Sequence, residues 1–281
     1  MTAAQQRQVS ALVFVGMALF WEALSLFYTA ELVPGVPLVP GWEVLFTRTL
    51  LSMSDYWTGG FGVEAVVDGG RRTYSGAVLS ILEHSWDTMV RLLVGMLVGS
   101  IGGTLLGLAI SWSDWTRRLI DLPVQVLRTL PLLAMVPLFQ LWFGTYFAGK
   151  VVFIGYGVGV LFVAGTINAV RNVPAIYVDN ARTLGATKLS IYRTIILPAI
   201  FPELRATIML SLGTAWATVI GAEYLGAQSG LGYILLYAQS YGFVDRMFFV
   251  ALLFVLYASI TYAIFDRISL RLLRWAPRGG V

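Results

Sequence analysis

Cysteine is absent from this chain of 281 residues, and histidine occurs only once, at position 84. Without cysteine there is no disulfide framework, thiol nucleophile or thiolate metal site. A single histidine excludes zinc motifs that need two, and we expect His84 to be an interfacial or loop residue. The hydroxyl residues of the apolar runs have no histidine beside them in sequence: Ser100, Thr104, Thr166, Ser211, Thr214 and Thr218. These absences argue against an intramembrane enzyme.

Charge is also scarce. Charged residues make up 12% of the chain and hydrophobic residues 58%, whereas a soluble domain carries about 25% charged residues. Apolar runs of about 20 residues recur, which is the length of a membrane helix, whereas barrel strands would show about 10-residue alternation. We therefore predict an all-α polytopic membrane protein. The net charge of +4 is explained by arginine in cytoplasmic loops better than by nucleic-acid binding.

Six membrane spans are predicted, at about residues 9–28, 87–110, 120–143, 151–170, 203–225 and 247–268. The first run is too long for the apolar core of a cleaved signal peptide, which is the alternative. Proline at 123, 131 and 137 predicts a kink in the third span. Between the first two spans we expect a short amphipathic helix at 41–53 and a loop at 54–72. Residues 233–241 are too few to cross and are expected to dip into the membrane.

Orientation follows from the distribution of lysine and arginine. With the N-terminus inside, eleven lie in inner segments: Arg7, Arg117, Arg118, Arg171, Arg182, Lys188, Arg193, Arg267, Arg271, Arg274 and Arg278. Five lie in outer segments: Arg48, Arg71, Arg72, Lys150 and Arg246. Both termini are therefore predicted to be cytoplasmic. The predicted organisation is a first helix with an extracytoplasmic segment (1–73), a membrane core (74–275) and a cytoplasmic tail (276–281).

One segment resembles a phosphate-binding loop without completing it. Gly144, Gly149 and Lys150 have the spacing of that motif, but Val151 stands where a serine or threonine would reach Mg²⁺. The segment also lies between two predicted spans rather than after a soluble strand. We therefore expect the chain not to bind ATP itself, and to hold no metal or other cofactor.

Polar and small residues inside the spans are the candidates for a translocation path. A carboxylate inside a membrane span is energetically costly, so Glu223 is expected to have a specific role. It either faces such a path or holds the following segment by hydrogen bonds. Arg128, which otherwise reaches the inner interface by snorkelling, Met135 and Pro137 are further path candidates. Glycine recurs every four residues at Gly95, Gly99, Gly103 and Gly107. Such rows let another helix approach closely, so packing is favoured over a substrate surface.

A polar segment between the fourth and fifth spans carries the most specific pattern. Asp179 is followed by Ala181, by Gly185 six positions after the carboxylate, and by Leu197-Pro198. We predict a helix over 179–189, with Asp179 and Arg182 in its first turn and the acidic group at the positive helix end. Leu184 and Ala186 flank Gly185, which breaks the helix or admits a close partner.

The spacing Asp179–Ala181–Gly185–Ile195–Leu197-Pro198 resembles the cytoplasmic loop of the permease subunits of binding-protein-dependent ABC importers. The family pattern has Glu-Ala-Ala, so Asp179 and Asn180 depart from it. Residues 127–138 with 141–144, and 221–225 with 230–232, resemble the nitrate/sulfonate/taurine/bicarbonate branch. The likeness covers about residues 75–275, and the segment 54–72 is longer than that branch leads us to expect.

This resemblance implies a type I ABC importer permease fold and several partners. A second permease subunit, expected to be identical, would pair with this one around a central path. Two ATP-binding subunits would bind ATP and Mg²⁺. An extracytoplasmic solute-binding protein would deliver a small anionic solute to the outer face of the permease, which would carry it across the bacterial inner membrane. The residues implied to couple to the ATPase are Asp179, Ala181, Arg182, Leu184, Gly185, Ala186, Leu197 and Pro198. A secondary transporter, and more remotely an intramembrane enzyme, are the rival functions.

Overall fold

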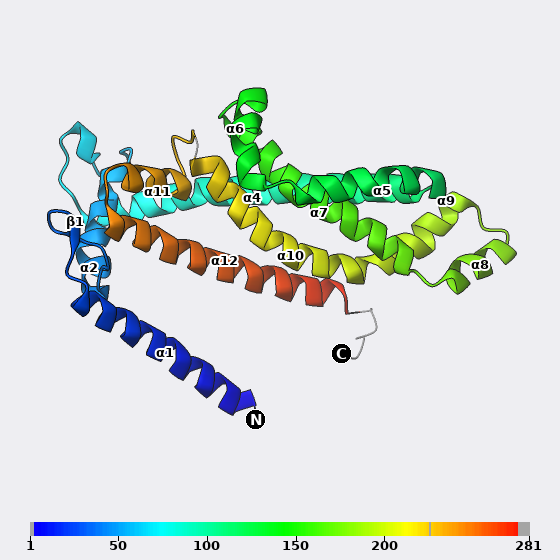
Figure 1. Ribbon diagram of the computed structural model, residues 1–281, viewed down its shortest axis with the longest axis horizontal. Helices are drawn as coiled ribbons and strands as arrows, with labels where there is room; N and C mark the ends of the chain where they lie inside the picture. The colour runs from blue at the N-terminus through cyan, green and yellow to red at the C-terminus, as the bar shows by residue number, and fades with distance from the viewer. Residues whose placement is uncertain (1–2, 225, 275–281) are drawn as a thin grey trace. The chain divides into compact units, whose positions relative to one another are not determined.

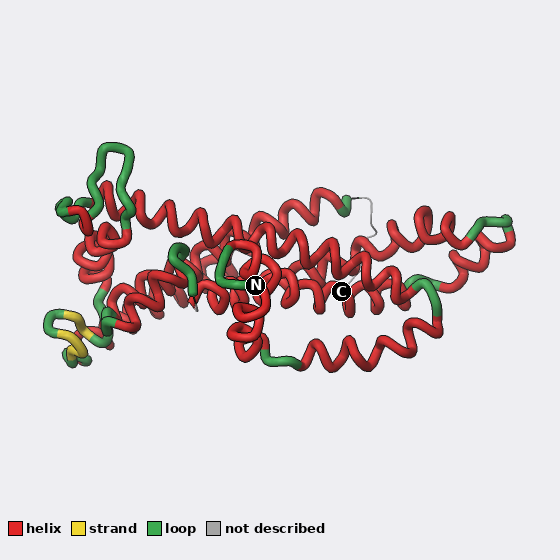
Figure 2. The backbone as a smooth tube through the Cα atoms, turned by 90° about the horizontal axis from the view of Figure 1, so that it is seen from above, coloured by secondary structure: helices red, strands yellow, loops and turns green. Residues whose placement is uncertain are grey.

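The computed structural model describes residues 3–224 and 226–274 and is almost entirely helical there. Figure 2 shows, besides the helices and the loops that join them, a small two-stranded hairpin. Within the described residues, five helical segments are long and apolar enough to cross a membrane, or up to six if one sharply bent pair counts as a span. The long helices are α1 (Ala3–Phe27), α4 (Tyr74–Ser111), α7 (Phe147–Asn172), α10 (Leu197–Tyr224) and α12 (Val244–Leu272). The predicted all-α membrane fold is confirmed.

The chain forms two compact units. The N-terminal unit contains the chain up to Trp86 together with Ser229–Val255, and the core unit contains Asp87–Gln228 and the chain from Leu256 onward. The predicted tail 276–281, Leu225 at the end of the predicted fifth span and Arg278 lie outside the described residues.

In the N-terminal unit, α1 leads into the hairpin of β1 (Glu31–Val33) and β2 (Val36–Pro37), which pair antiparallel. These strands are too short to show alternation in sequence, and we did not predict them. A continuous helical run follows, made of α2 (Trp42–Val44), the π-helical η1 (Leu45–Thr49), α3 (Leu50–Ser52) and the 3₁₀ turn η2 (Met53–Tyr56). The helix predicted at 41–53 is thus confirmed, and 57–73 is irregular apart from η3 (Val66–Asp68).

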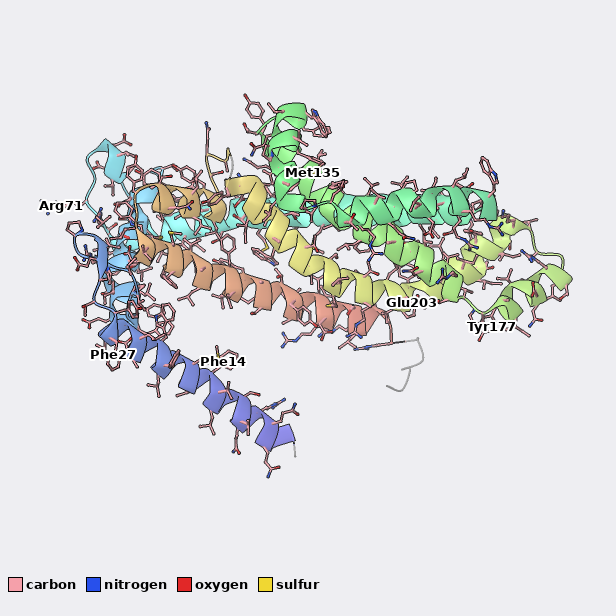
Figure 3. The ribbon with its side chains drawn as sticks, in the orientation of Figure 1. Phe14, Phe27, Arg71, Met135, Tyr177 and Glu203 are labelled. Carbon is pink, nitrogen blue, oxygen red and sulfur yellow. The ribbon has the colours of Figure 1, made fainter. Side chains whose placement is uncertain are left out.

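The start of this run is tied to α1 by hydrogen bonds. The carboxylate of Glu22 accepts from the backbone N–H of Trp42 at 2.9 Å, so it caps one of the donors that every helix start leaves open. The indole of Trp42 donates to the carbonyl of Ala18 at 3.0 Å. Figure 3 shows Phe14 and Phe27 on α1, both highly exposed, as expected of a helix surrounded by lipid.

A second network in this unit joins the irregular segment to the first residues of α12. Arg246 donates to Asp55 at 2.8 Å and to the hydroxyl of Tyr56 at 3.3 Å. Arg72 also pairs with Asp55, at 2.7 Å. Burial of Tyr56 raises the pKa of its hydroxyl to about 12, because the phenolate would lose its hydration. The segment 54–72 is thereby held by charge as well as by packing.

His84 does not lie in a loop, because α4 begins at Tyr74 rather than near 87. The expectation that His84 lies in a loop is therefore wrong. The side chain is buried, and its Nδ1 accepts from the backbone N–H of Gly230, at the start of α11 (Leu231–Ser240), at 2.9 Å. Its Nε2 lies 3.1 Å from the carbonyl of Tyr56, to which it donates when Nδ1 accepts. His84 is thus a hydrogen-bonded residue of the N-terminal unit.

In the core unit, the glycine row of α4 faces α7. A Cβ added to Gly99 would lie 2.6 Å from the carbonyl oxygen of Gly155, and one added to Gly107 would lie 2.6 Å from Cβ of Thr166. Gly95 and Gly103 meet Ile154 and Gly159 in the same way. The backbone of α4 therefore lies directly against that of α7 at Gly99, Gly103 and Gly107, and against the side chain of Ile154 at Gly95. Only glycine allows so close an approach.

The predicted third span is two helices rather than one kinked helix. α5 (Asp114–Thr129) and α6 (Leu132–Phe143) meet at an angle of 99°, and Figure 1 shows α6 turning sharply away from α5. The break lies at Pro131, because a residue before proline avoids the helical conformation. Leu130 is accordingly extended, with φ −63° and ψ 128°. Pro123 and Pro137 lie inside helices that continue past them.

The remaining helices of the core unit close around α7. α10 packs against α7, and the two lie side by side in Figure 1. Arg205 of α10 donates to Asp266 at 2.6 Å, and the indole of Trp216 donates to Thr261 at 3.0 Å. Both partners belong to the C-terminal half of α12. These polar contacts fix α12 against α10 where lipid provides no hydrophobic driving force between helices.

We expect Gly99→Ala to lower the free energy of unfolding by about 2 kcal/mol, because the added methyl must push α4 away from α7. Gly102→Ala is the matched control, since a Cβ at Gly102 meets nothing within 4 Å. Both substitutions change helix propensity equally, so thermal or SDS unfolding of the two variants isolates the packing effect. Equal stabilities would contradict the close contact.

Candidate functional site

The segment between α7 and α10 projects from the core unit as a short helix, α8 (Ala175–Thr183). Our prediction of a helix over 179–189 is wrong at both ends. Val173 precedes Pro174 and is extended, which ends α7 and lets α8 begin directly after the proline. Asp179 and Arg182 therefore lie in the middle and last turn of α8, not in its first turn.

Gly185 ends α8 in a left-handed turn with φ +78°. The N–H of Gly185 donates to the carbonyl of Arg182 at 2.9 Å, and the N–H of Ala186 donates to that of Ala181 at 3.0 Å. These two bonds form a Schellman motif, which satisfies carbonyls that the helix end leaves open. The sequence left open whether Gly185 breaks the helix or admits a close partner. In the structure it ends the helix, and a Cβ added there would meet nothing within 4 Å.

No residue of α8 is buried, although several of its neighbours are apolar. Leu184 is 87% exposed, Ile176 63% and Tyr177 56%. The ion pair of Asp179 with Arg182 is also exposed, at 3.4 Å, and contributes little to stability. Figure 3 shows Tyr177 on α8, which lies beyond the ends of α7 and α10. An exposed helix on which apolar side chains stand beside charged ones, with no cover from the rest of the chain described, is typical of a docking surface.

Short, well-anchored elements connect α8 to α10. They are α9 (Lys188–Ile191), capped by Thr187, and the π-helical η4 (Tyr192–Ile196), after which Leu197-Pro198 begin α10. The hydroxyl of Tyr192 donates to the carbonyl of Ser111 at 2.6 Å, and Lys188 lies 4.7 Å above the ring of Trp112. A force on α8 would therefore act on α4, α7 and α10 together.

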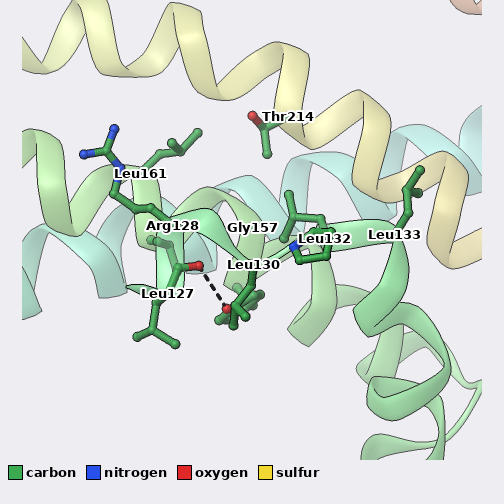
Figure 4. Close-up of a pocket in the computed structure, with 11 residues that line it drawn as sticks. Leu127, Arg128, Leu130, Leu132, Leu133, Gly157, Leu161 and Thr214 are labelled. Carbon is green, nitrogen blue, oxygen red and sulfur yellow. Dashed lines mark hydrogen bonds between the residues drawn. The ribbon is translucent and has the colours of Figure 1, made fainter. Parts of the chain in front are cut away.

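Arg128 lines two cavities, one at the helix break around Pro131 and the other between α5 and α7. The first, of about 390 Å³, is mostly apolar and is drawn in Figure 4. Its residues include Leu127, whose carbonyl accepts from Tyr156 at 3.4 Å, and Thr214 of α10. The second, of about 310 Å³, has polar walls: Asp121, Gln125, Arg128, Asn168 and Arg171. Among the described residues, Arg128 has no hydrogen-bond or ion-pair partner, so its guanidinium is available to an anion.

The other two path candidates lie elsewhere. Met135 is half-buried against the apolar cluster of Val136, Phe139 and Phe153. Pro137 is exposed on α6. Within the described chain neither residue lines the two cavities that Arg128 lines. The sequence could not separate these residues from Arg128, because the 99° bend places Arg128 on α5 and the other two on α6.

Glu223 is fully buried and hydrogen-bonded through both carboxylate oxygens. Arg91 donates to Oε1 at 2.5 Å and Thr88 donates to Oε2 at 2.8 Å. Arg91 also pairs with Asp87 at 3.3 Å. Neither Arg91 nor Thr88 was predicted from the sequence as a partner of Glu223. Their spacing of three residues on one face of α4 was the available signal. This geometry supports the interpretation in which Glu223 holds helices together.

Comparison with known proteins places this arrangement in context. Residues 92–274 match the family model for the binding-protein-dependent transport system inner membrane component. The putative aliphatic sulfonates transport permease protein SsuC of Bacillus subtilis is 31% identical over 72% of this chain and 74% of its own length. The Escherichia coli protein of that name is 31% identical over 69% of this chain and 74% of its own length.

A third relative is a permease protein as well, and a solved structure shares the fold. The taurine transport system permease protein TauC of Escherichia coli is 26% identical over 56% of this chain and 57% of its own length. The fold is that of a chain in the inward-facing MetNI methionine ABC transporter, with a TM-score of 0.57 at 22% identity, covering 66% of this chain and 92% of that one.

We expect Glu223→Gln to lower the free energy of unfolding by about 3 kcal/mol, because it leaves the buried Arg91 without its main counter-charge. The double variant Arg91→Met/Glu223→Gln should recover much of that loss. An SDS unfolding titration of the three proteins measures both effects. A stable single variant with altered solute transport would instead favour a role in the path.

Proposed function

This chain belongs to the family of binding-protein-dependent transport system inner membrane components, and we propose that it carries a small sulfonate-like anion inward. It is thus a multi-pass permease subunit of an ABC importer and not an enzyme. The proposal adds the solute class, the coupling route and the assembly. The observation that carries it is α8, an exposed helix of mixed polar and apolar residues on a segment anchored to three membrane helices.

Coupling to the ATPase would use α8 as the contact. Leu184 and its neighbours offer apolar surface, and the Schellman turn at Gly185 sets the direction in which the chain returns to the membrane. Asp179, Ala181 and Arg182 belong to α8 and Ala186 to the turn that ends it, while Leu197 and Pro198 start the span that would receive the motion. ATP and Mg²⁺ would bind in the partner, whose closure would alternate the permease between inward-open and outward-open states.

The solute class is supported by the names of the relatives and by charge. Two relatives are named for aliphatic sulfonates and one for taurine. In this chain, Arg128 and Arg171 line the polar cavity between α5 and α7, where a guanidinium could bind a sulfonate in bidentate fashion. The assembly would contain a second copy of this chain, two ATP-binding subunits and an extracytoplasmic solute-binding protein. Both termini and α8 would lie in the cytoplasm.

Uptake by the reconstituted importer tests the solute class. Proteoliposomes that hold the complex, with ATP inside and the binding protein outside, should import radiolabelled ethanesulfonate. Unlabelled taurine should compete, whereas a neutral sulfone should not. Arg128→Gln should lower the initial rate about tenfold, equivalent to one lost charged contact of about 1.4 kcal/mol. Arg118→Gln, an exposed change on the same helix, is the control. Import of neutral solutes only would refute the anionic assignment.

Two substitutions at Gly185 test the coupling route. Valine tolerates φ +78° poorly, whereas asparagine enters this region more readily. We expect the Gly185→Val variant to insert normally and to retain ATP hydrolysis. The amount of solute imported per ATP hydrolysed should fall about tenfold or more, which corresponds to a rise of about 1.4 kcal/mol in the barrier of the coupled step. Gly185→Asn should keep most of the coupling. Normal coupled uptake by the valine variant would count against α8 as the contact.

A further inference from the structure

The turn between α6 and α7 carries a lysine that the proposed transport route does not use. Gly144 adopts φ +77°, and α7 starts at Phe147, so Lys150 lies in the first turn of a helix of 26 residues. A Cβ at Gly149 would collide with the carbonyl of Gly144, which shows how tightly the turn is folded. This is the stretch that resembles a phosphate-binding loop in sequence but has Val151 at its last position.

Lys150 is only 7% exposed. Among the residues that the structure describes, none forms a hydrogen bond or ion pair with its ammonium group. Lysine is rarely buried without a partner, because the ammonium loses its hydration and gains nothing in return. Inside a membrane protein such a residue is a candidate functional site.

The carboxylates around Lys150 are already engaged by other groups. The charges that act on its ammonium are those of Arg91, Glu223 and Asp87. Both oxygens of Glu223 accept hydrogen bonds, from Arg91 and Thr88, and Asp87 pairs with Arg91. Both carboxylates are therefore bonded to Arg91, and neither forms an ion pair with Lys150.

A second buried donor lies in the same small cavity. Lys150 and Gln140 both line it, together with Gly144, Thr145 and Ala222. The amide nitrogen of Gln140 is buried, and within the described part of the chain it has no hydrogen-bond partner. The cavity volume is about 10 Å³, enough for about one water-sized atom group. The first turn of a long helix adds the positive end of its dipole.

We propose that this cavity, the lysine-turn site, holds one oxygen of a small oxyanion such as a sulfonate or nitrate. The ammonium of Lys150 supplies the charge, and the amide of Gln140 donates a hydrogen bond. Within the described residues, the amide nitrogen of Gln140 lacks an acceptor and the ammonium of Lys150 lacks a bonded partner. An occupant that brings lone pairs would satisfy both donors, and a negative one would also be attracted by the ammonium. The oxyanion is either the head group of the transported solute, which rests on the proposed function, or a free inorganic anion.

Thermal unfolding of the whole importer complex in nanodiscs tests the site without any transport. The baseline buffer contains sodium gluconate, a bulky carboxylate that serves as the reference anion. Replacing gluconate by methanesulfonate or nitrate at equal ionic strength should raise the melting temperature by about 2–4 °C, because the anion binds only the folded state. Neutral dimethyl sulfone, close to methanesulfonate in size, should have no effect.

The chain has only two lysines, so a matched control is available. Lys150→Met should abolish the anion-dependent shift, whereas Lys188→Met, on an exposed side chain, should keep it. In gluconate, Lys150→Met should melt no lower than the wild type, because it removes a buried charge that lacks a partner. Gln140→Leu should at least halve the shift.

Three results would overturn the site: no anion-specific shift in the wild type, the same shift in Lys150→Met, or a Lys150→Met chain that fails to assemble. Assembly failure would mean that the ammonium has an essential protein partner. Uptake of ethanesulfonate then identifies the source of the oxyanion. A tenfold or greater loss in Lys150→Met assigns it to the solute, and unchanged uptake assigns it to a free anion. If the wild type imports no anion, the proposed function fails while the melting shift still reports on the site.

Discussion

The core unit depends on how closely α4 can approach α7. Four glycines in successive turns let the two helices pack closely, and this seam fixes the positions of the side chains on either side of it. Lipid offers helices no hydrophobic reason to associate, so close packing and polar bonds must provide the stability. Thr88 and Arg91 extend from α4 beside this seam, which is where Glu223 of α10 meets them.

The charges of this unit divide into those that hold the structure and those that are available to a ligand. Arg91 and Glu223 compensate each other, as do Arg205 and Asp266. Arg128 and Lys150 have no such partner among the described residues, and each lines a cavity. In a membrane, a positive charge without a partner is costly, so these two positions are where an anionic solute could be recognised. Lys150 lies on α7, next to the turn that follows α6, and Arg128 lies at the end of α5.

The polar segment after α7 combines rigidity with exposure. Pro174 starts α8 and Gly185 ends it, so both limits are set by local backbone chemistry. Beyond it, the bond from Tyr192 to Ser111 and the stacking of Lys188 on Trp112 tie the return path to α4. A helix that is free on its outer surface and fixed at its base can pass a rigid-body motion to the spans behind it.

The sequence by itself determined the class of protein, the approximate spans, the glycine seam and the loop pattern. These features depend on composition and on the spacing of residues within one segment, both of which can be read without knowing what the segment packs against. It did not determine the 99° break between α5 and α6, since three prolines were present and only Pro131 interrupts the helix. It also left open what Glu223 binds, because its partner lies 132 positions away. Only the tertiary structure decides which charges meet across such distances, and therefore which are left for a ligand.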